Sequence, residues 1–405
     1  MANWSATEAW EIVLEQVCPL EARLLPLSEA LGYHLAEEVR ADRDLPPADR
    51  SSMDGYAVRR ADLHGDPCIL RLVGEVAAGS PRRPRVKPGA CVRIFTGANV
   101  PPGADTVVMQ EQTEEENGSV TVRLPAPEAA NILRRAEDAS KGTELLPRGA
   151  RLDAMQVGVC AAVGKGRVRV HCRPETAILC TGSELRNAED RVRPHEIRDS
   201  NGPALGAALH QWGFPGARHR RVADDPATLA AALRRALRGH DVVLISGGVS
   251  VGRYDYVREA VESAGATVRF HRVRMRPGRP SLYATAPRGR HIFGLPGNPL
   301  SVLTAFHEFA LPAIRRLAGC PPEDCRPEWP LPLAGAAESD GSVRRCGLAR
   351  LACCEGRMAA ALVPFRSSAD LVSAGRADGV VLLAEGRTNF DAGEMVAFRA
   401  WRPLP

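Results

Sequence analysis

The sequence predicts a multidomain chain that combines an α/β fold with smaller β domains. From Thr176 to about residue 317, short apolar runs alternate with helical patterns, which is typical of a parallel α/β sheet. Residues 67–124 and 334–405 instead contain strand-like runs separated by Gly and Pro turns, which is typical of small β domains. A chain of 405 residues has room for about two to four domains.

The N-terminal segment is predicted to begin with a helix. Residues 5–8 match a capping box, and apolar residues then recur at helical spacing as far as Val17. A second short helix is expected over residues 27–31. Mixed strand and helix signals return after the first β region, so we expect an N-terminal domain made of residues 1–45 and 140–174.

A β domain is expected to interrupt this N-terminal domain over residues 46–139. The polar, Pro-containing segment 42–52 predicts the linker that enters it. An Asp-Gly turn at Asp54 then leads into a strand. The further strands expected in this domain are Cys68–Val73, Cys91–Ile94, Thr106–Gln110 and Ser119–Leu124.

A glycine loop within the α/β region suggests a binding site. A buried strand is predicted at residues 242–245, followed by the loop SGGVSVG, which contains Gly247, Gly248 and Ser250, and by a helix over about 254–264. A strand, a glycine loop and a helix N-terminus together can bind phosphate or another oxyanion. The same glycines can also serve only to form a tight turn.

Three more loops are expected to follow strands of the same sheet: TGSE (181–184), RPGRP (276–280) and LPGNP (295–299). Parallel strands end at one edge, so these loops should share a rim, where ligands bind in such sheets. The pair Asp224-Asp225, at a predicted helix start, should lie near them. The α/β domain is expected to cover residues 175–320, with a β-barrel-like domain over residues 328–405.

Charged side chains beside these turns suggest a site for a phosphorylated, anionic small molecule. Arginines and glycine loops suit oxyanions, and carboxylates near phosphate suggest Mg²⁺. The sequence shows no Walker motif and no Ser-His-Asp candidate, so the reaction would depend on positioning and electrostatics. For Asp54 and Thr96 a simple turn-forming role is the alternative. The charged candidates are Asp54, Asp138, Glu184, Asp225, Asp255, Arg134, Arg135, Arg276 and Arg279.

Composition limits the class of protein. The formal charge of +5 is compatible with an anionic ligand but too weak to indicate nucleic acid. Eleven cysteines without a Cys-x-x-Cys motif suggest reduced thiols in a cytoplasmic protein. No window approaches the roughly 18 apolar residues of a membrane span, so no membrane partner is expected.

Several motifs occur in an order that resembles the MoeA family of molybdopterin molybdenumtransferases, which is related to the gephyrin E domain. The similarity is strong over about residues 5–320 and weaker beyond. The motifs are MDGYAV (53–58), TGANVP (96–101), VVMQEQT (107–113), RRAED (134–138), TGSEL (181–185), DSN (199–201), DDP (224–226), SGGVSVGRYDY (246–256), RPGRP (276–280) and LPGNP (295–299).

The resemblance implies an elongated subunit with a MogA-like three-layer α/β domain, and a homodimer with its active cleft between subunits. It implies insertion of molybdate into adenylylated molybdopterin, with Mg²⁺ and release of AMP, and transient contact with other proteins of molybdenum cofactor biosynthesis. A molybdopterin adenylyltransferase, or a non-catalytic scaffold of the same family, is the alternative. Tungstate could replace molybdate.

The resemblance also assigns roles to residues. It implies that Arg276 and Arg279 hold molybdate, although the family usually has lysines there. Asp225 and Asp255 would place Mg²⁺. Ala136 stands where Gly is usual, and the double serine of the last domain is matched here to Val372-Ser373. The other implied functional positions are Asp54, Thr96, Asp138, Glu184, Gly247, Gly248, Ser250, Pro296, Asn298 and Pro299.

Overall fold

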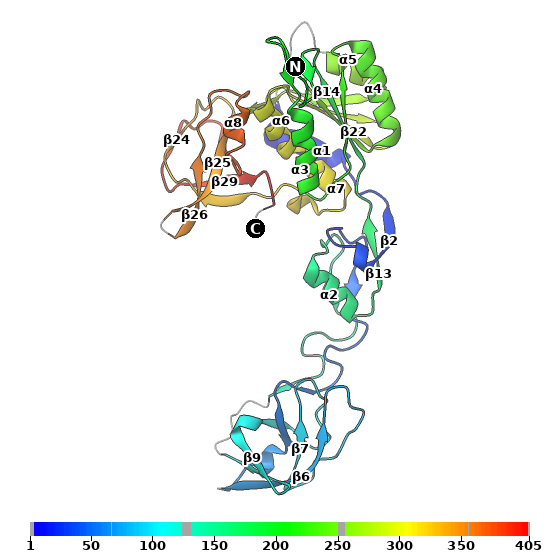
Figure 1. The fold of residues 1–405 in the computed structure, drawn as a ribbon, viewed down its shortest axis with the longest axis vertical. Coiled ribbons are helices and arrows are strands. Elements are labelled where there is room, and N and C mark those ends of the chain that lie inside the picture. The colour runs from blue at the N-terminus through cyan, green and yellow to red at the C-terminus, as the bar shows by residue number, and fades with distance from the viewer. Residues whose placement is uncertain (1–3, 66, 124–130, 250–255, 355, 404–405) are drawn as a thin grey trace. The chain divides into compact units, whose positions relative to one another are not determined.

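The computed structural model describes residues 4–65, 67–123, 131–249, 256–354 and 356–403. These residues form two compact units (Figure 1). The first unit consists of Met1–Glu37, Gly149–Ala154 and Arg167–Pro405, and the second of Glu38–Arg148 and Met155–Gly166.

A six-stranded sheet with the order β17-β14-β18-β22-β21-β19 forms the centre of the first unit. Its first four strands are parallel, whereas β21 and β19 are antiparallel additions at one edge. Strand β18 is buried along its whole length, as its run of β-branched residues predicts. The strands are β14 (Thr176–Thr181), β17 (Arg218–Val222), β18 (Val242–Ser246), β19 (Thr267–His271), β21 (Leu282–Ala286) and β22 (Arg290–Leu295).

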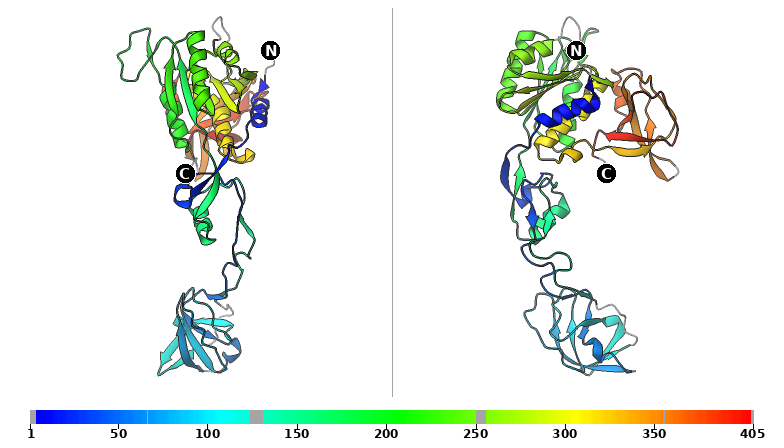
Figure 2. Two further views of the ribbon diagram at one scale, coloured as in Figure 1. Left: turned by 90° about the vertical axis from the view of Figure 1, so that its right-hand side faces the viewer. Right: turned by 180° about the vertical axis from the view of Figure 1, so that it is seen from behind.

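Helices cover both faces of this sheet, which confirms the predicted three-layer α/β fold (Figures 1 and 2). Helices α4 (Pro226–Gly239) and α5 (Tyr256–Ser263) pack on one face. Helix α1 (Ala6–Gln16), which has the predicted capping box, packs in the core on the other face. The remaining helical segments on that face are α3 (Asn201–Gln211), α6 (Pro299–Ala305), the π-helical turn Phe306–Ala310 and α7 (Leu311–Leu317).

The C-terminal residues form a seven-stranded sheet together with two strands from earlier in the chain. The order is β1-β20-β25-β27-β29-β23, with β26 paired to β25. The prediction that RPGRP follows a strand of the α/β sheet is therefore wrong. Strand β19 ends at His271, Arg272 has a φ of 74°, and the chain then enters β20, which pairs with β25.

The remaining elements of the first unit are short or belong to the C-terminal domain. They are β1 (Trp4–Ser5), β2 (Ala22–Pro26), the 3₁₀ turn Leu27–Glu29, β13 (Arg167–His171), β15 (Leu185–Arg186), β16 (Ile197–Arg198), β20 (Val273–Arg276), the 3₁₀ turn Pro322–Asp324, β23 (Trp329–Pro332), β24 (Ala337–Glu338), β25 (Arg344–Cys354), β26 (Arg357–Leu362), α8 (Leu371–Ala374), β27 (Gly379–Leu383), β28 (Asn389–Phe390) and β29 (Met395–Ala400).

A buried ion cluster connects the C-terminal sheet to the helices. Arg399, from β29, pairs with Glu308 of the π-helical turn and with Glu328. Arg326 lies 3.8 Å from the second carboxylate oxygen of Glu308. Burial alone would raise the pKa of Glu308, but the charges of Arg399 and Arg326 lower it overall, so this carboxyl group stays ionised.

The second unit contains the predicted β domain. Its six-stranded sheet has the order β8-β5-β7-β6-β10-β9. The sequence analysis missed β9, because its Thr-Glu-Glu-Glu composition gives no apolar signal. The elements are β3 (Val39–Arg40), β4 (Arg50–Ser51), β5 (Gly55–Val58), the 3₁₀ turn Arg60–Asp62, β6 (Cys68–Val76), β7 (Ala90–Ile94), β8 (Thr106–Met109), the 3₁₀ turn Gln110–Gln112, β9 (Thr113–Glu116), β10 (Ser119–Val122), β11 (Ile132–Leu133), β12 (Glu144–Leu146) and α2 (Ala154–Ala162).

Among the residues that the structure describes, no helix has the length and apolar character that crossing a membrane would require.

Candidate functional site

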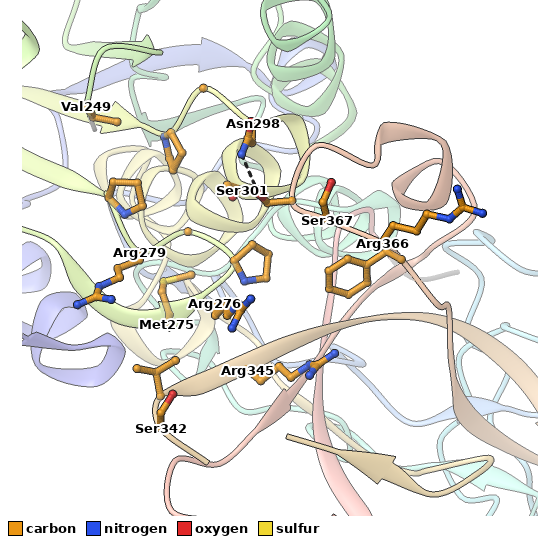
Figure 3. Close-up of a pocket in the computed structure, with 18 of the residues that line it drawn as sticks. Val249, Met275, Arg276, Arg279, Asn298, Ser301, Ser342, Arg345, Arg366 and Ser367 are labelled. Atoms are coloured by element: carbon orange, nitrogen blue, oxygen red, sulfur yellow. Dashed lines mark hydrogen bonds between the residues drawn. The ribbon is translucent and has the colours of Figure 1, made fainter. Parts of the chain in front are cut away.

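A pocket of about 860 Å³ lies in the first unit, where the α/β domain meets the C-terminal sheet. We call it the arginine pocket after Arg276, Arg279, Arg345 and Arg366, which line it (Figure 3). Arg276 and Arg279 belong to the RPGRP segment, whereas Arg345 and Arg366 come from the C-terminal domain. Four cationic side chains around one cavity favour an anionic ligand.

Arg276 and Arg345 are direct partners in the register of β20 and β25. Both side chains line the arginine pocket, where Figure 3 labels them. Two like charges placed opposite one another destabilise a sheet. An anion bound between the two guanidinium groups would remove this repulsion, so the register itself points to an oxyanion position.

Little negative charge from the described residues balances these arginines. Arg276 lies 3.4 Å from Asp340, with both side chains largely exposed. The backbone and side chain of Ser342 donate to Asp340 and, with Arg276, lower its pKa. Within the described part of the chain, Arg279, Arg345 and Arg366 form no ion pair.

The LPGNP loop forms another wall of the arginine pocket through Pro296, Gly297 and Asn298. Asn298 Nδ2 donates to Ser368 Oγ at 2.8 Å, which joins this loop to the C-terminal domain (Figure 3). Pro299 starts α6, where its missing N–H costs nothing. Asn201 Nδ2 holds the other side of the loop by donating to Gly297 O at 2.8 Å.

The glycine loop approaches the same pocket. Gly247 has a φ of 96°, and a Cβ there would lie 2.4 Å from the carbonyl oxygen of Thr181, so only glycine fits. Gly248 lines the arginine pocket. Ser250 and Asp255, two of the predicted site residues, lie outside the described residues.

Asp224 and Asp225, the adjacent carboxylates that follow β17, make different contacts. Asp225 caps α4 by accepting from the backbone N–H of Thr228 at 2.8 Å, and the Thr228 side chain and backbone lower its pKa. Asp224 instead faces the glycine turn and accepts from Thr181 Oγ1 at 3.1 Å. Both carboxylates lie at the strand-end rim and are the type of ligand that Mg²⁺ takes together with phosphate oxygens.

Glu184 does not line the arginine pocket. Its side chain is exposed and folds back over Gly182, where an added Cβ would lie 2.8 Å from Glu184 Oε1. Its backbone carbonyl accepts from the N–H of Ile197. The described contacts of Glu184 therefore organise its own loop.

A separate pocket of about 640 Å³ lies within the second unit. Thr96 and Asp138 line it, and Asp54 accepts from both the backbone N–H and the side-chain hydroxyl of Thr96 at 2.7 Å. These two bonds, the backbone one first, lower the pKa of Asp54. The structure thus brings Asp54, Thr96 and Asp138 into one neighbourhood, although they are far apart in the sequence.

The RRAED segment anchors the linker beside this second pocket. Arg134 pairs with Asp49 at 2.8 Å, and Arg135 pairs with Asp44 at 2.5 Å. Both arginine side chains are more than half exposed, so these ion pairs contribute little to stability. Ala136 has a φ of 62°, a conformation that favours glycine.

The sequence did not predict the residues that the C-terminal domain contributes to this pocket, and the serines in its wall differ from the Val372-Ser373 pair named above. Ser367 and Ser368 line the arginine pocket, whereas Ser373 donates from its backbone and its hydroxyl to Asp370, the N-cap of α8, and Val372 is exposed. The adjacent Ser367-Ser368 pair was a visible signal. Arg345 and Arg366 carried no signal, because arginine supplies nearly all the basic residues of this chain.

The fold and the pocket define a multidomain α/β protein with an arginine-lined pocket at the edge of its C-terminal sheet. Residues 4–164 match the model of the MoeA N-terminal region (domain I and II), and residues 177–316 match that of a probable molybdopterin binding domain. A molybdopterin molybdenumtransferase from Nostoc sp. is 40% identical over 74% of this chain and 70% of its own length. One from Staphylococcus epidermidis is 32% identical over 97% of this chain and 94% of its own length.

Solved structures agree with these sequence matches. A crystal structure titled as a molybdopterin biosynthesis MoeA protein from Pyrococcus horikoshii superimposes with a TM-score of 0.79 at 29% identity, covering 100% of both chains. A second such structure gives a TM-score of 0.83 at 25% identity, covering 98% of this chain and 100% of the other. The chain belongs to the MoeA family of molybdopterin molybdenumtransferases.

Proposed function

We propose that this chain inserts molybdate into adenylylated molybdopterin and releases AMP. The observation that carries the proposal is the Arg276–Arg345 register pair within a pocket of four arginines. Molybdate is a tetrahedral dianion, and each guanidinium group can donate two parallel hydrogen bonds to such an oxyanion. The names of the relatives supply the substrate class, and the pocket supplies the place where the oxyanion would bind.

The loops around the pocket suit the rest of the substrate. Gly247 and Gly248 let backbone N–H groups approach the phosphates of an adenylylated pterin. Asp224 and Asp225 would hold Mg²⁺, which neutralises phosphate charge when it is bound. Asn298 and Ser368 keep the molybdate side of the pocket closed against the C-terminal domain.

The chemistry follows from this placement. The two dithiolene thiols of the pterin lose their protons and form two Mo–S bonds, while one Mo–O bond of the bound molybdate breaks and that oxygen leaves with the two protons as water. Water cleaves the phosphoanhydride bond, so that one phosphate leaves as AMP and the other stays on the pterin. The arginines hold the oxometalate in position throughout, which is catalysis by positioning and electrostatics.

We further propose that the chain acts as a homodimer and that the Asp54–Thr96 pair completes the site from the partner subunit. A mixture of two inactive variants tests this arrangement. Asp54→Asn and Arg276→Ala homodimers should each be inactive, whereas mixed dimers should regain part of the activity because one of their two sites is intact. If mixed dimers stay inactive, the shared site is wrong.

The reaction itself is tested with purified protein, adenylylated molybdopterin and molybdate. AMP release that depends on molybdate, together with activation of a molybdenum-requiring apoenzyme, is the expected result. Pyrophosphate release from ATP and molybdopterin would instead indicate an adenylyltransferase. Binding of the pterin without either product would indicate a scaffold.

A further inference from the structure

Three metal-ligating side chains converge beside the DSN turn, outside the lining of the arginine pocket. They are Cys180 at the end of β14, Asp199 just before α3, and His219 on β17. One ligand atom from each lies within 4.8 Å of the other two. Cys180 and Asp199 are 1% and 4% exposed, so two of the three groups are buried.

The fold explains why the three residues meet. Strands β14 and β17 are parallel neighbours in which Ile178 lies opposite His219. Cys180 is two residues after Ile178 in β14, so its side chain points to the same face of the sheet as those of Ile178 and His219. Helix α3 packs on this face and brings Asp199 with it. Gly202, in the first turn of α3, leaves room for the imidazole, because a Cβ there would lie 2.1 Å from His219 Nε2.

The ligand atoms are already oriented toward one another. His219 Nε2 lies 2.8 Å from Asp199 Oδ2, and Asp199 Oδ1 accepts from the N–H of Gly202 at 3.0 Å. The second of these bonds fixes the carboxylate from behind, as outer-shell hydrogen bonds do for metal ligands. About one third of the His219 side chain is exposed, which provides a route from solvent.

We propose that Cys180, Asp199 and His219 bind a transition-metal dication, of which Zn²⁺ is the best match. Thiolate, imidazole and carboxylate are the three protein ligand types of Zn²⁺, and a water molecule from the His219 side would complete the tetrahedron. Mg²⁺ prefers oxygen ligands only, so this site is distinct from the magnesium position proposed above.

Binding exchanges a proton for the metal. Zn²⁺ binds cysteine as the thiolate, so the Cys180 thiol has to lose its proton when the metal binds. Zn²⁺ binding forms a sulfur–zinc bond and releases the thiol proton to solvent. No oxidant or reductant takes part.

The site would stabilise the turn that supports the arginine pocket. Asn201, two residues after Asp199, donates to Ser246 Oγ at 3.0 Å and to Gly297 O at 2.8 Å. It therefore connects the end of β18 to the LPGNP loop. A metal on Asp199 would hold this connection in place, so it has a structural role and no part in the chemical step.

Cobalt titration tests the proposal, because Co²⁺ bound to a thiolate has a charge-transfer absorption band in the near ultraviolet. The full-length chain is stripped with a chelator, kept reduced and titrated with Co²⁺. We expect a band that saturates at about one equivalent and disappears on addition of Zn²⁺. Cys180→Ser should abolish the band, and His219→Gln should weaken Co²⁺ binding at least about tenfold.

Matched variants separate this site from the other thiols and histidines. Cys172→Ser and His210→Gln change residues outside the cluster and should leave the titration unchanged. If Cys180→Ser fails to fold, the partly exposed His219→Gln variant decides alone. The proposal is overturned if the wild type shows no saturating band, or if the band survives with unchanged affinity in His219→Gln.

Discussion

The two pockets described above differ in the charges of their walls: four arginines line the first, whereas Arg43, Arg50 and Asp138 line the second. The arginine pocket of the first unit has four guanidinium groups and a single neighbouring carboxylate that contacts them, Asp340, in the described residues. In the pocket of the second unit, Asp138 is part of the wall, and Asp54 is held by two bonds from Thr96. The first has excess positive charge available for a ligand, whereas the Asp54 carboxylate is already engaged.

This difference indicates which pocket can hold a dianion by itself. A tetrahedral oxometalate needs several donors and a positive field, and the arginine pocket offers both. The second pocket has two arginines in its wall, and the carboxylate of Asp138 beside them repels such a ligand. We therefore expect oxyanion affinity to depend on the first unit, whereas the second unit contributes to turnover.

Removing both register-paired arginines is the most severe test of this contrast. Arg276→Ala with Arg345→Ala should weaken molybdate binding by about 3–6 kcal/mol, since each charge-assisted contact contributes about 1.5–3 kcal/mol. Asp54→Asn should leave binding unchanged while lowering AMP release. Isothermal titration with molybdate measures the first effect. Arg350→Ala, an exposed arginine on the same strand, is the matched control.

Breaking the buried ion cluster should lower the stability of the first unit and leave that of the second unit unchanged. Glu308→Gln leaves Arg399 and Arg326 buried without their shared carboxylate, which should cost about 3–5 kcal/mol. All five tryptophans lie in the first unit, so fluorescence during urea unfolding reports that unit alone.

Hydrogen exchange of the second unit should stay unchanged in the Glu308→Gln variant. Glu262→Gln removes an exposed pair with Arg258 and should cost less than about 0.5 kcal/mol. Equal losses of unfolding free energy in the two variants would show that the buried cluster contributes no more stability than an exposed ion pair.

Acid should weaken the first unit through His291. Burial lowers the pKa of His291 from its ordinary value of 6.5 to about 4, and its Nδ1 lies 2.9 Å from the hydroxyl of Tyr283. Between pH 6.5 and 4 the unfolded chain binds a proton that the folded chain does not. Stability should therefore be independent of His291 above pH 6.5 and fall by about 3 kcal/mol toward pH 4.

The measurement for His291 is tryptophan-detected unfolding between pH 4 and 8. In His291→Gln the loss over this range should be about 3 kcal/mol smaller than in the wild type, whatever the variant costs at neutral pH. An identical dependence of stability on pH in both proteins would show that His291 does not cause the loss in acid.

The smallest expected effect is a gain in the second unit. Ala136 adopts a left-handed conformation that costs about 1–2 kcal/mol for residues with a Cβ, while glycine loses about 0.5–1 kcal/mol more chain entropy on folding. Ala136→Gly should therefore stabilise this unit by about 0.5–1 kcal/mol, seen as slower hydrogen exchange around residues 131–139. Ala139→Gly, with a Cβ-compatible backbone, should destabilise it.

The sequence predicted those elements whose formation depends on residues close together along the chain. The β-branched run of β18 and the capping box of α1 identified those elements, and parallel strand order placed the TGSE, SGGVSVG and LPGNP loops on one rim. Strand β20 was not predicted, because its alternation of apolar and charged residues is compatible with both the α/β sheet and the C-terminal sheet. Its pairing with β25 depends on residues about 70 positions further along.

The site was predicted less completely for a similar reason. Arg345 reaches the pocket only through the β20–β25 register, and His219 reaches Asp199 only because Gly202 has no side chain. Neither contact can be predicted from the spacing of residues along the chain. The sequence also does not show that Asp225 caps α4 while Asp224 accepts from Thr181, because backbone geometry decides which of two adjacent carboxylates caps a helix.

The central claim is that the paired arginines of β20 and β25 hold the oxometalate. Crystals soaked with molybdate and AMP, measured at the molybdenum absorption edge, test it most directly. The account predicts an anomalous peak in contact with the guanidinium groups of both Arg276 and Arg345. A well-occupied molybdenum peak elsewhere, with no density between these two side chains, would contradict it.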